Sequence, residues 1–338
     1  MNFLVTGGAG FIGSHVCERL LRDGHAVWAF DDLNDFYDPQ FKRRNLKEIQ
    51  AIAGGCAAAA AHRRRSSAAA TRFEEPFEFV HGDITNRAAL DEIFSSVKFD
   101  QVLHLAARAG VRPSLADPAL YQRVNVEGTV NVLEAARTHR VKKILIASSS
   151  SVYGVNSKTP FSESDPICSA VSPYAASKLA CEALGHVWHH VYGMDVAALR
   201  FFTVYGPRQR PDLVIYKFAR LISAGKPIPV FGDGNAARDY TYITDTLDGI
   251  MACTRKEFGY ELFNLGESQT VKLNDLIALL EKLLGRKAVI DRQPVQPGDV
   301  PITFADISRA RAKLGYHPQV KFEQGLPKFV DWFLRSNV

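Results

Sequence analysis

The amino-acid sequence predicts an α/β protein built on a doubly wound parallel sheet. Short apolar segments alternate with amphipathic segments through about the first 200 of the 338 residues, and such alternation is typical of a parallel sheet with helices on both faces. A glycine-rich turn joins the first apolar segment to the first amphipathic one. After residue 205 proline and glycine become denser, which indicates a smaller, loop-rich region over the carboxyl ends of the strands.

The first three elements form a βαβ unit. Residues 2–6 are a short apolar run that ends in glycines, which predicts a strand. Residues 13–23 place Val16, Leu20 and Leu21 on one side, as in an amphipathic helix. Residues 25–30 are a second apolar strand. A strand–helix–strand unit implies parallel strands and a right-handed crossover.

The same alternation continues along the chain. Further strands are expected at 77–81, 101–105, 143–148 and 196–202, and further helices at 86–95, 119–138 and 173–191. These elements place a dinucleotide-binding domain at residues 1–202 and a mainly substrate-binding domain at 203–338. Segments near 240–265 are expected to return to the first domain, and residues 273–284 to form a helix of the second.

Residues 53–72 are a low-complexity stretch rich in alanine and arginine. Alanine favours helix, but no apolar periodicity holds the stretch to a core. It is therefore expected to be a surface insertion that is flexible or weakly helical. Its three consecutive arginines at 63–65 are interpreted as a solvated charge run rather than a phosphate site.

The composition excludes several classes of protein. The chain is 46% hydrophobic with a net charge of +5, so a buried core is expected, and nucleic acid is not a required partner. The five cysteines are scattered and never form a CxxC pair, which argues against disulfides and zinc and for a reducing, cytoplasmic location. No leader peptide and no long uncharged apolar run is evident, so no membrane association is expected.

A phosphate-binding turn is expected between the first strand and helix. Gly7, Gly10 and Gly13 are spaced as GxxGxxG after a strand and before a helix, the context in which glycines let the backbone approach a pyrophosphate. Asp31 ends the second strand, 18 residues past Gly13. An acid there accepts the ribose hydroxyls of an adenosine and repels a 2′-phosphate, so NAD is favoured over NADP.

A tyrosine–lysine pair and a serine run suggest acid–base chemistry. Tyr174 and Lys178 are four residues apart on a helix that Ser172 is expected to cap, so they share one face. The lysine ammonium and a nicotinamide ring would stabilise the tyrosine phenolate. The serines at 148–151 follow an apolar strand at its carboxyl end, where α/β folds bind ligands.

Taken together, these motifs resemble the nucleotide-sugar epimerases of the extended short-chain dehydrogenase/reductase superfamily. The resemblance covers nearly the whole chain outside 53–72 and is most similar to the branch that acts on UDP-glucuronate. It is carried by DDLNDFYDP (31–39), AARAGVRPS (106–114), ASSSSVYG (147–154), RFFTVYGPRQRPD (200–212), FGDGNAARDYTYI (231–243) and QPGDVPITFADI (296–307).

The resemblance implies a role for each matching residue. Tyr174 would be the base, Lys178 its partner and Ser149 a hydroxyl that assists at the sugar 4-hydroxyl. The expected NAD contacts are Gly7, Gly10, Phe11, Ile12, Gly13, Asp31, Asp32, Asn34, Asp83, Ile84, Leu105, Ala106, Ala107, Asn125, Ser148, Tyr174, Lys178 and Phe201. The expected UDP-sugar contacts are Arg112, Ser149, Ser150, Ser151, Tyr174, Thr203, Arg210, Lys217, Val230, Arg238, Gln296 and Asp299. Gln296 stands where related glucose epimerases carry an arginine, so contacts there would differ.

The implied reaction is conversion of UDP-glucuronate to UDP-galacturonate through a transient 4-keto sugar, with NAD reused in each cycle. A 4-keto uronate is a β-keto acid and can lose CO₂, so Ser150, Ser151 and Thr203 are expected to hold its carboxylate. Related dehydratases carry an Asp-Glu pair and decarboxylases a glutamate where this chain has Ser150 and Ser151, which disfavours both reactions.

Several alternatives stay open at the level of sequence. The nearest is 4-epimerisation of UDP-glucose or UDP-N-acetylglucosamine; an NAD-sensing binding protein and a net dehydrogenase are others. His186, His189 and His190 crowd one helix without an acidic neighbour, so they are interpreted as exposed or dimer-facing, and no metal is expected. By analogy with related enzymes, a homodimer is expected through 119–138 and the tyrosine–lysine helix.

Overall fold

The computed structural model describes residues 1–64, 76–155, 158–167, 169–296 and 298–336. Its strands are β1 (Asn2–Thr6), β2 (Ala26–Asp31), β3 (Phe77–His81), β4 (Gln101–His104), β5 (Lys143–Ser149), β6 (Asp195–Phe201), β7 (Thr203–Tyr205), β8 (Ile228–Phe231), β9 (Ala237–Tyr242), β10 (Tyr260–Leu265), β11 (Thr270–Lys272) and β12 (Ile290–Gln293). Its α-helices are α1 (Phe11–Arg22), α2 (Pro39–Arg64), α3 (Arg87–Ser96), α4 (Val111–Ala116), α5 (Pro118–Tyr121), α6 (Gly128–Thr138), α7 (Pro173–Tyr192), α8 (Val214–Ser223), α9 (Ile243–Thr254), α10 (Leu273–Leu284), α11 (Ser308–Leu314) and α12 (Phe322–Arg335).

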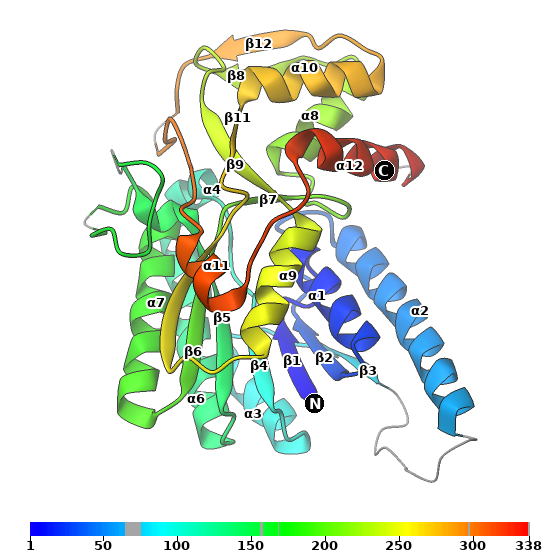
Figure 1. Ribbon diagram of the computed structural model, residues 1–338, viewed down its shortest axis with the longest axis vertical. Helices are drawn as coiled ribbons and strands as arrows, with labels where there is room; N and C mark the ends of the chain where they lie inside the picture. The colour runs from blue at the N-terminus through cyan, green and yellow to red at the C-terminus, as the bar shows by residue number, and fades with distance from the viewer. Residues whose placement is uncertain (65–75, 156–157, 168, 297, 337–338) are drawn as a thin grey trace.

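A seven-stranded parallel sheet forms the centre of the molecule. Its strand order is β10-β6-β5-β4-β1-β2-β3, and every neighbouring pair is parallel. Helices α3, α6 and α7 cover one face, and α1, α2 and α9 cover the other (Figure 1). The order reverses between β1 and β4, where a crevice opens at the carboxyl ends of the strands. The predicted doubly wound fold is confirmed.

A smaller region lies beyond the carboxyl ends of this sheet (Figure 1). It contains a three-stranded sheet ordered β11-β9-β7, a β12–β8 pair, and helices α8, α10 and α12. The predicted helix at 273–284 is confirmed as α10. The chain returns from this region to the central sheet, where β10 pairs with β6 and Tyr260 lies opposite Val196. The division at residue 202 stays a prediction.

The helix predicted at 119–138 is not one regular α-helix. A π-helical turn at Gln122–Glu127 separates α5 from α6. Within this turn the Asn125 carbonyl oxygen accepts a bond from the Thr129 hydroxyl at 2.5 Å, four residues along the chain. Proline at 118 and the apolar periodicity gave no sign of this change.

Helix α2 was not predicted: no helix was expected before residue 53, and residues 53–72 were expected to be flexible or weakly helical. It runs through Arg64 and so includes part of the low-complexity stretch at 53–72; residues 65–72 of that stretch lie outside the described residues. None of the helices in the described part of the chain combines the length and apolar character needed to cross a lipid bilayer.

Candidate active site

A cavity of about 420 Å³ lies at the carboxyl edge of the central sheet. It is bounded by the glycine turn, the ends of β2, β4 and β5, helix α7 and the start of the smaller region. The predicted residues that line it are Gly7, Gly10, Phe11, Ile12, Gly13, Asp31, Asp32, Asn34, Asp83, Ile84, Leu105, Ala106, Ala107, Ser148, Ser149, Ser150, Ser151, Tyr174, Lys178, Phe201, Thr203 and Arg210. Residues expected to contact a cofactor and residues expected to contact a sugar therefore share one cavity.

The glycine turn is closely packed at two of its glycines. Gly7 has a φ of +70°, and a Cβ there would lie 2.8 Å from the Ala106 nitrogen. A Cβ at Gly13 would lie 2.1 Å from the Gly7 carbonyl oxygen. Gly10 is the N-cap of helix α1 and has no side chain to cap the first turn. The first amide groups of α1 thus face a cavity wall where an anionic ligand can accept from them.

The acid at the end of β2 has a basic partner. Asp31 is buried, and its Oδ1 lies 3.0 Å from the Nζ of Lys42, a residue of α2. The Leu33 amide donates to the same oxygen at 2.9 Å, and the Ala9 amide donates to Oδ2 at 3.2 Å. These bonds fix the carboxylate in the cavity wall beside the glycine turn.

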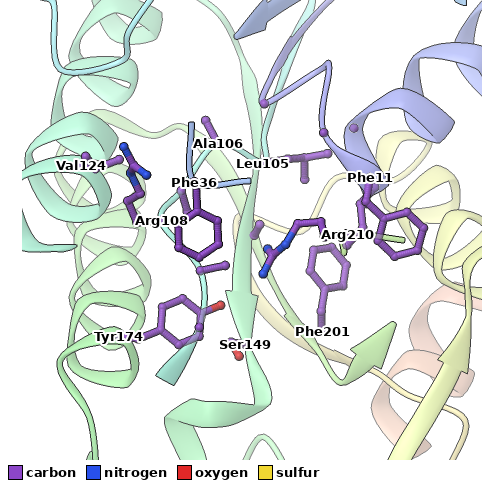
Figure 2. Close-up of a pocket in the computed structure, with 18 of the residues that line it drawn as sticks. Phe11, Phe36, Leu105, Ala106, Arg108, Val124, Ser149, Tyr174, Phe201 and Arg210 are labelled. Carbon is purple, nitrogen blue, oxygen red and sulfur yellow. The ribbon is translucent and has the colours of Figure 1, made fainter. Parts of the chain in front are cut away.

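Tyr174 and Lys178 come from the first turns of α7. Ser172 caps this helix, with its hydroxyl accepting from the Ala175 amide at 3.1 Å, as predicted. Lys178 is buried and donates to the Ala147 carbonyl of β5 at 2.7 Å. The lysine thus ties α7 to the strand that carries Ser149, and Figure 2 shows Tyr174 and Ser149 turned toward the same part of the cavity.

The serines after β5 are held in order. The Ser149 hydroxyl donates to the Ser151 hydroxyl at 3.2 Å and accepts from the Ser151 amide at 3.2 Å. One residue earlier, the Ser148 hydroxyl donates to a carboxylate oxygen of Glu182 on α7 at 2.5 Å. Glu182 forms a buried two-pronged ion pair with Arg200 of β6, with both contacts at 2.8 Å.

Tyr121 packs against Tyr174 behind the cavity lining, and Arg210 and Phe36 belong to the lining itself. The Tyr121 ring stands edge-on to Tyr174 with centroids 6.2 Å apart, and burial raises the pKa of Tyr121 to about 12. Its hydroxyl therefore stays protonated and donates to the Ala109 carbonyl at 2.8 Å. Arg210 lies over the Phe36 ring at 5.4 Å and points into the cavity (Figure 2).

A second group of predicted residues lies apart from the cavity lining. Arg112 of α4 and Asp299 form an ion pair at 2.5 Å, and the Arg112 guanidinium lies 4.1 Å from the centroid of the Phe231 ring. Arg238 is half-buried, and its pKa is lowered by burial, with Asp299 opposing that effect. Basic and acidic groups from both regions of the chain thus meet here.

The remaining predicted residues are scattered. Gln296 bonds to the carbonyl of Pro294, Lys217 is half-buried on α8, and Val230 is buried in β8. Asn125 is buried behind the lining and exchanges two bonds with the Arg108 backbone, at 2.7 and 3.0 Å. It orders the loop that bounds the cavity.

Sequence reasoning missed several lining residues, among them Phe36, Tyr37, Lys42, Arg108 and Asp212. The first three follow Asp31 in DDLNDFYDPQFK, so proximity to the expected ribose acid was an available signal. Asp212 pairs with Arg210 at 2.7 Å. Arg108 reaches the cavity through the loop that Asn125 orders, which no local pattern reveals.

Proteins of similar sequence include two UDP-glucuronate 4-epimerases. The UDP-glucuronate 4-epimerase of Thermodesulfobacterium geofontis is 42% identical over 331 residues, which cover 98% of this chain and 95% of that protein. The probable UDP-glucuronate 4-epimerase of Rhizobium meliloti is 35% identical over 352 residues, covering 98% and 97%.

Solved structures of nucleotide-sugar 4-epimerases have a similar fold. The UDP-glucuronic acid 4-epimerase of Bacillus cereus, in complex with UDP-glucuronic acid and NAD, superposes with a TM-score of 0.87 at 34% identity, covering 99% of this chain and 100% of that one. The UDP-glucose 4-epimerase of Thermotoga maritima, with UDP-glucose, gives a TM-score of 0.86 at 31% identity, covering 100% of both chains. The GDP-mannose 4,6-dehydratase family matches residues 4–329. The chain therefore belongs to the GDP-mannose 4,6-dehydratase family of the extended short-chain dehydrogenases/reductases.

Proposed function

We propose that this protein is an NAD-dependent 4-epimerase that interconverts UDP-glucuronate and UDP-galacturonate. The observation that carries the proposal is one cavity that joins a glycine turn and its ribose acid to Tyr174, Ser149 and two further serines. The relatives from Thermodesulfobacterium geofontis and Bacillus cereus support the choice of substrate.

The residues at one end of the cavity fit a dinucleotide. The packing of Gly7 and Gly13 leaves no room for side chains there, and the uncapped start of α1 offers amide donors to a pyrophosphate. Asp31 offers a carboxylate to ribose hydroxyls. When bound, NAD supplies a group that accepts hydride from the sugar C4 and later returns it to the opposite face.

The chain's own residues move the proton. Tyr174 is the general base for the sugar 4-hydroxyl, and the Lys178 ammonium stabilises its phenolate form. Lys178 is already fixed by the Ala147 carbonyl, so its charge needs no reordering when the base ionises. When substrate binds, the Ser149 hydroxyl turns its single proton from the Ser151 hydroxyl to the same sugar oxygen, while it continues to accept from the Ser151 amide.

The second group of residues is proposed to bind the UDP portion. Arg238 and Arg112 offer positive charge to a diphosphate, and Asp299 offers a carboxylate to the uridine ribose. The Arg112–Asp299 pair joins α4 to the segment after β12. A nucleotide bound between α4 and the segment after β12 would link the two regions of the chain. It would also anchor the UDP portion while the keto sugar rotates to present its other face.

The serine pair separates this proposal from the reaction that gives the family its description. A 4,6-dehydratase needs an acid and a base beside the sugar C5 and C6, and residues 150 and 151 here are both serine. Serine hydroxyls donate to a carboxylate without a charge of their own, so they suit a uronate. Thr203 lines the same cavity and adds a third hydroxyl.

One experiment separates the candidates. The purified protein is incubated with UDP-glucuronate, UDP-glucose and UDP-N-acetylglucosamine in turn, and the products are followed by NMR. We expect UDP-galacturonate from the first sugar, without CO₂ release and without accumulation of NADH. Stoichiometric NADH would indicate a dehydrogenase, and turnover of the neutral sugars alone would favour the runner-up, a UDP-glucose or UDP-N-acetylglucosamine 4-epimerase.

We further propose a cytoplasmic homodimer that pairs through α7 and the helical segment before β5. Support comes from Val187 and Val191, which are 45% and 58% exposed on α7 although both are apolar. Cys17, Cys181 and Cys253 are buried free thiols, in keeping with a reducing location. Sedimentation equilibrium of the protein against a Val187→Glu variant tests the dimer.

A further inference from the structure

Lys42 is a buried ammonium beside the expected ribose acid. It lies in the first turns of α2, is 5% exposed and lines the cavity. Its Nζ lies 3.0 Å from Asp31 Oδ1 and 3.6 Å from Asp32 Oδ1, and 5.7 Å from the centroid of the Tyr37 ring. A lysine is rarely buried unless it is paired, so the two carboxylates hold this charge at the cavity wall.

The contact with Lys42 limits what Asp31 can still accept. An ionised carboxylate has about four acceptor positions. The Leu33 amide and Lys42 both donate to Oδ1, and the Ala9 amide donates to Oδ2. Oδ2 is therefore the oxygen better able to take a ribose hydroxyl, and the ammonium is bound to the other oxygen of the same carboxylate.

An acid at the end of the second strand selects an unmodified adenosine ribose, whereas a basic residue near the same place accommodates a 2′-phosphate. This chain carries both groups in contact. We propose that Lys42 is a specificity-determining residue for the 2′ position of the adenosine ribose. While the Asp31 carboxylate engages Lys42, the site takes a 2′-hydroxyl. When that carboxylate is neutralised, the Lys42 ammonium binds a 2′-phosphate. This inference rests on the proposed use of NAD.

The charges give the direction of the effect. Asp31 and Asp32 together carry two negative charges, and Lys42 offsets one of them. Removal of the lysine leaves the site more negative, which penalises a 2′-phosphate more than a hydroxyl. Neutralisation of Asp31 has the opposite effect, because the buried ammonium then keeps only Asp32 as an acidic partner and is less fully offset toward the ligand.

The test measures binding rather than turnover. Dissociation constants for NADH and NADPH are determined by cofactor fluorescence for the wild type, Asp31→Asn and the double variant Asp31→Asn/Lys42→Met. We expect Asp31→Asn to tighten NADPH relative to NADH by about tenfold or more, the size of one charge-assisted hydrogen bond. The double variant should lose that gain. Asp31→Asn/Lys47→Met, which removes an exposed lysine of the same helix, should keep it.

If the Asp31→Asn protein does not fold, a single variant that keeps Asp31 still tests the proposal. Lys42→Met in the otherwise natural chain should raise the ratio of the NADPH to the NADH dissociation constant about tenfold, whereas Lys47→Met should leave it unchanged. An unchanged ratio in Lys42→Met, or a gain that survives in the double variant, overturns the proposal. If the wild type binds neither dinucleotide, the proposed function fails instead.

Discussion

Tyr174 owes its position to three neighbours that the structure brings together. Ser172 caps the helix, Lys178 ties that helix to Ala147 of β5, and the Tyr121 ring stands against the tyrosine ring. None of these contacts involves the Tyr174 hydroxyl. The oxygen is thereby left to face the cavity while the rest of the side chain is fixed.

We therefore expect Tyr174→Phe to lower the epimerisation rate at least about 100-fold, the usual contribution of a general base. NADH binding should be little changed, since the glycine turn and Asp31 are untouched. Rates by NMR and binding by fluorescence check this. Tyr192→Phe, the same change at the far end of α7, should keep the wild-type rate, and retained activity in Tyr174→Phe would refute the assignment.

The hydroxyls of Ser151 and Thr203 are expected to protect the uronate from decarboxylation. Ser151→Ala and Thr203→Val each remove one donor from the cavity wall, so we expect slower epimerisation and a several-fold larger share of CO₂ among the products. Labelled substrate and gas trapping measure that share. Ser164→Ala, at an exposed serine, is the control, and an unchanged product ratio in both variants would contradict this role.

The sequence predicted the cavity residues best where they follow a strand end. Gly7, Asp31, Ser149 and Thr203 each lie at such a place, and the carboxyl ends of parallel strands meet at one edge. Lys42 could not be predicted this way, because it reaches Asp31 only through the packing of α2. The Arg112–Asp299 pair joins residues 187 positions apart, which no local pattern encodes.

At the scale of elements, a buried ion pair holds α7 to strands β5 and β6. Arg200 of β6 is 2% exposed and pairs with Glu182 of α7, which also accepts from Ser148 of β5. Arg200 donates to the Tyr153 hydroxyl at 3.0 Å as well. Lys178 and Glu182, one turn apart, thus bind two successive residues of β5.

Removal of one member of this ion pair should lower the free energy of unfolding more than removal of both members. Arg200→Met leaves the Glu182 carboxylate buried without its partner, and we expect the free energy of unfolding to fall by about 3–5 kcal/mol. Arg200→Met/Glu182→Leu should lose less than the single variant. Urea denaturation measures both, and a double variant that is the less stable of the two would contradict the charge argument.

Element boundaries were predictable where apolar runs are bounded by glycine or proline, as at Phe77–His81 and Pro173–Tyr192. At the π turn Gln122–Glu127, the Asn125 carbonyl accepts from both the Thr129 hydroxyl and the Cys181 thiol. Cys181 belongs to another helix. The turn therefore takes part in a tertiary contact, which residues 119–138 alone do not reveal.

At the scale of the whole molecule, buried histidines make stability depend on pH. Burial lowers the pKa of His104 from 6.5 to about 3, and the neutral ring bonds to the hydroxyls of Thr6 and Thr129 at 2.7 and 2.9 Å. The unfolded chain binds a proton below pH 6.5 while the folded chain does not. Stability is thus lost as the pH falls from about 6.5 toward 3.

We expect this one group to remove about 2 kcal/mol of stability between pH 7 and pH 5. His104→Gln lacks the titrating ring, so its loss of stability over that interval should be smaller by about that amount. Urea denaturation at both pH values measures the difference. His317→Gln, at an exposed position, should behave as the wild type, and equal losses in all three proteins would exclude His104 as the cause.

The placement of β10 has a consequence for synthesis. Strand β6 remains an open edge of the sheet until residues 260–265 pair with it, and unpaired edges invite association with other chains. A nascent chain that has left the ribosome only as far as residue 202 therefore exposes the unpaired backbone edge of β6. Completion of the sheet must wait for the late part of translation, and a fragment cut there is expected to aggregate rather than fold.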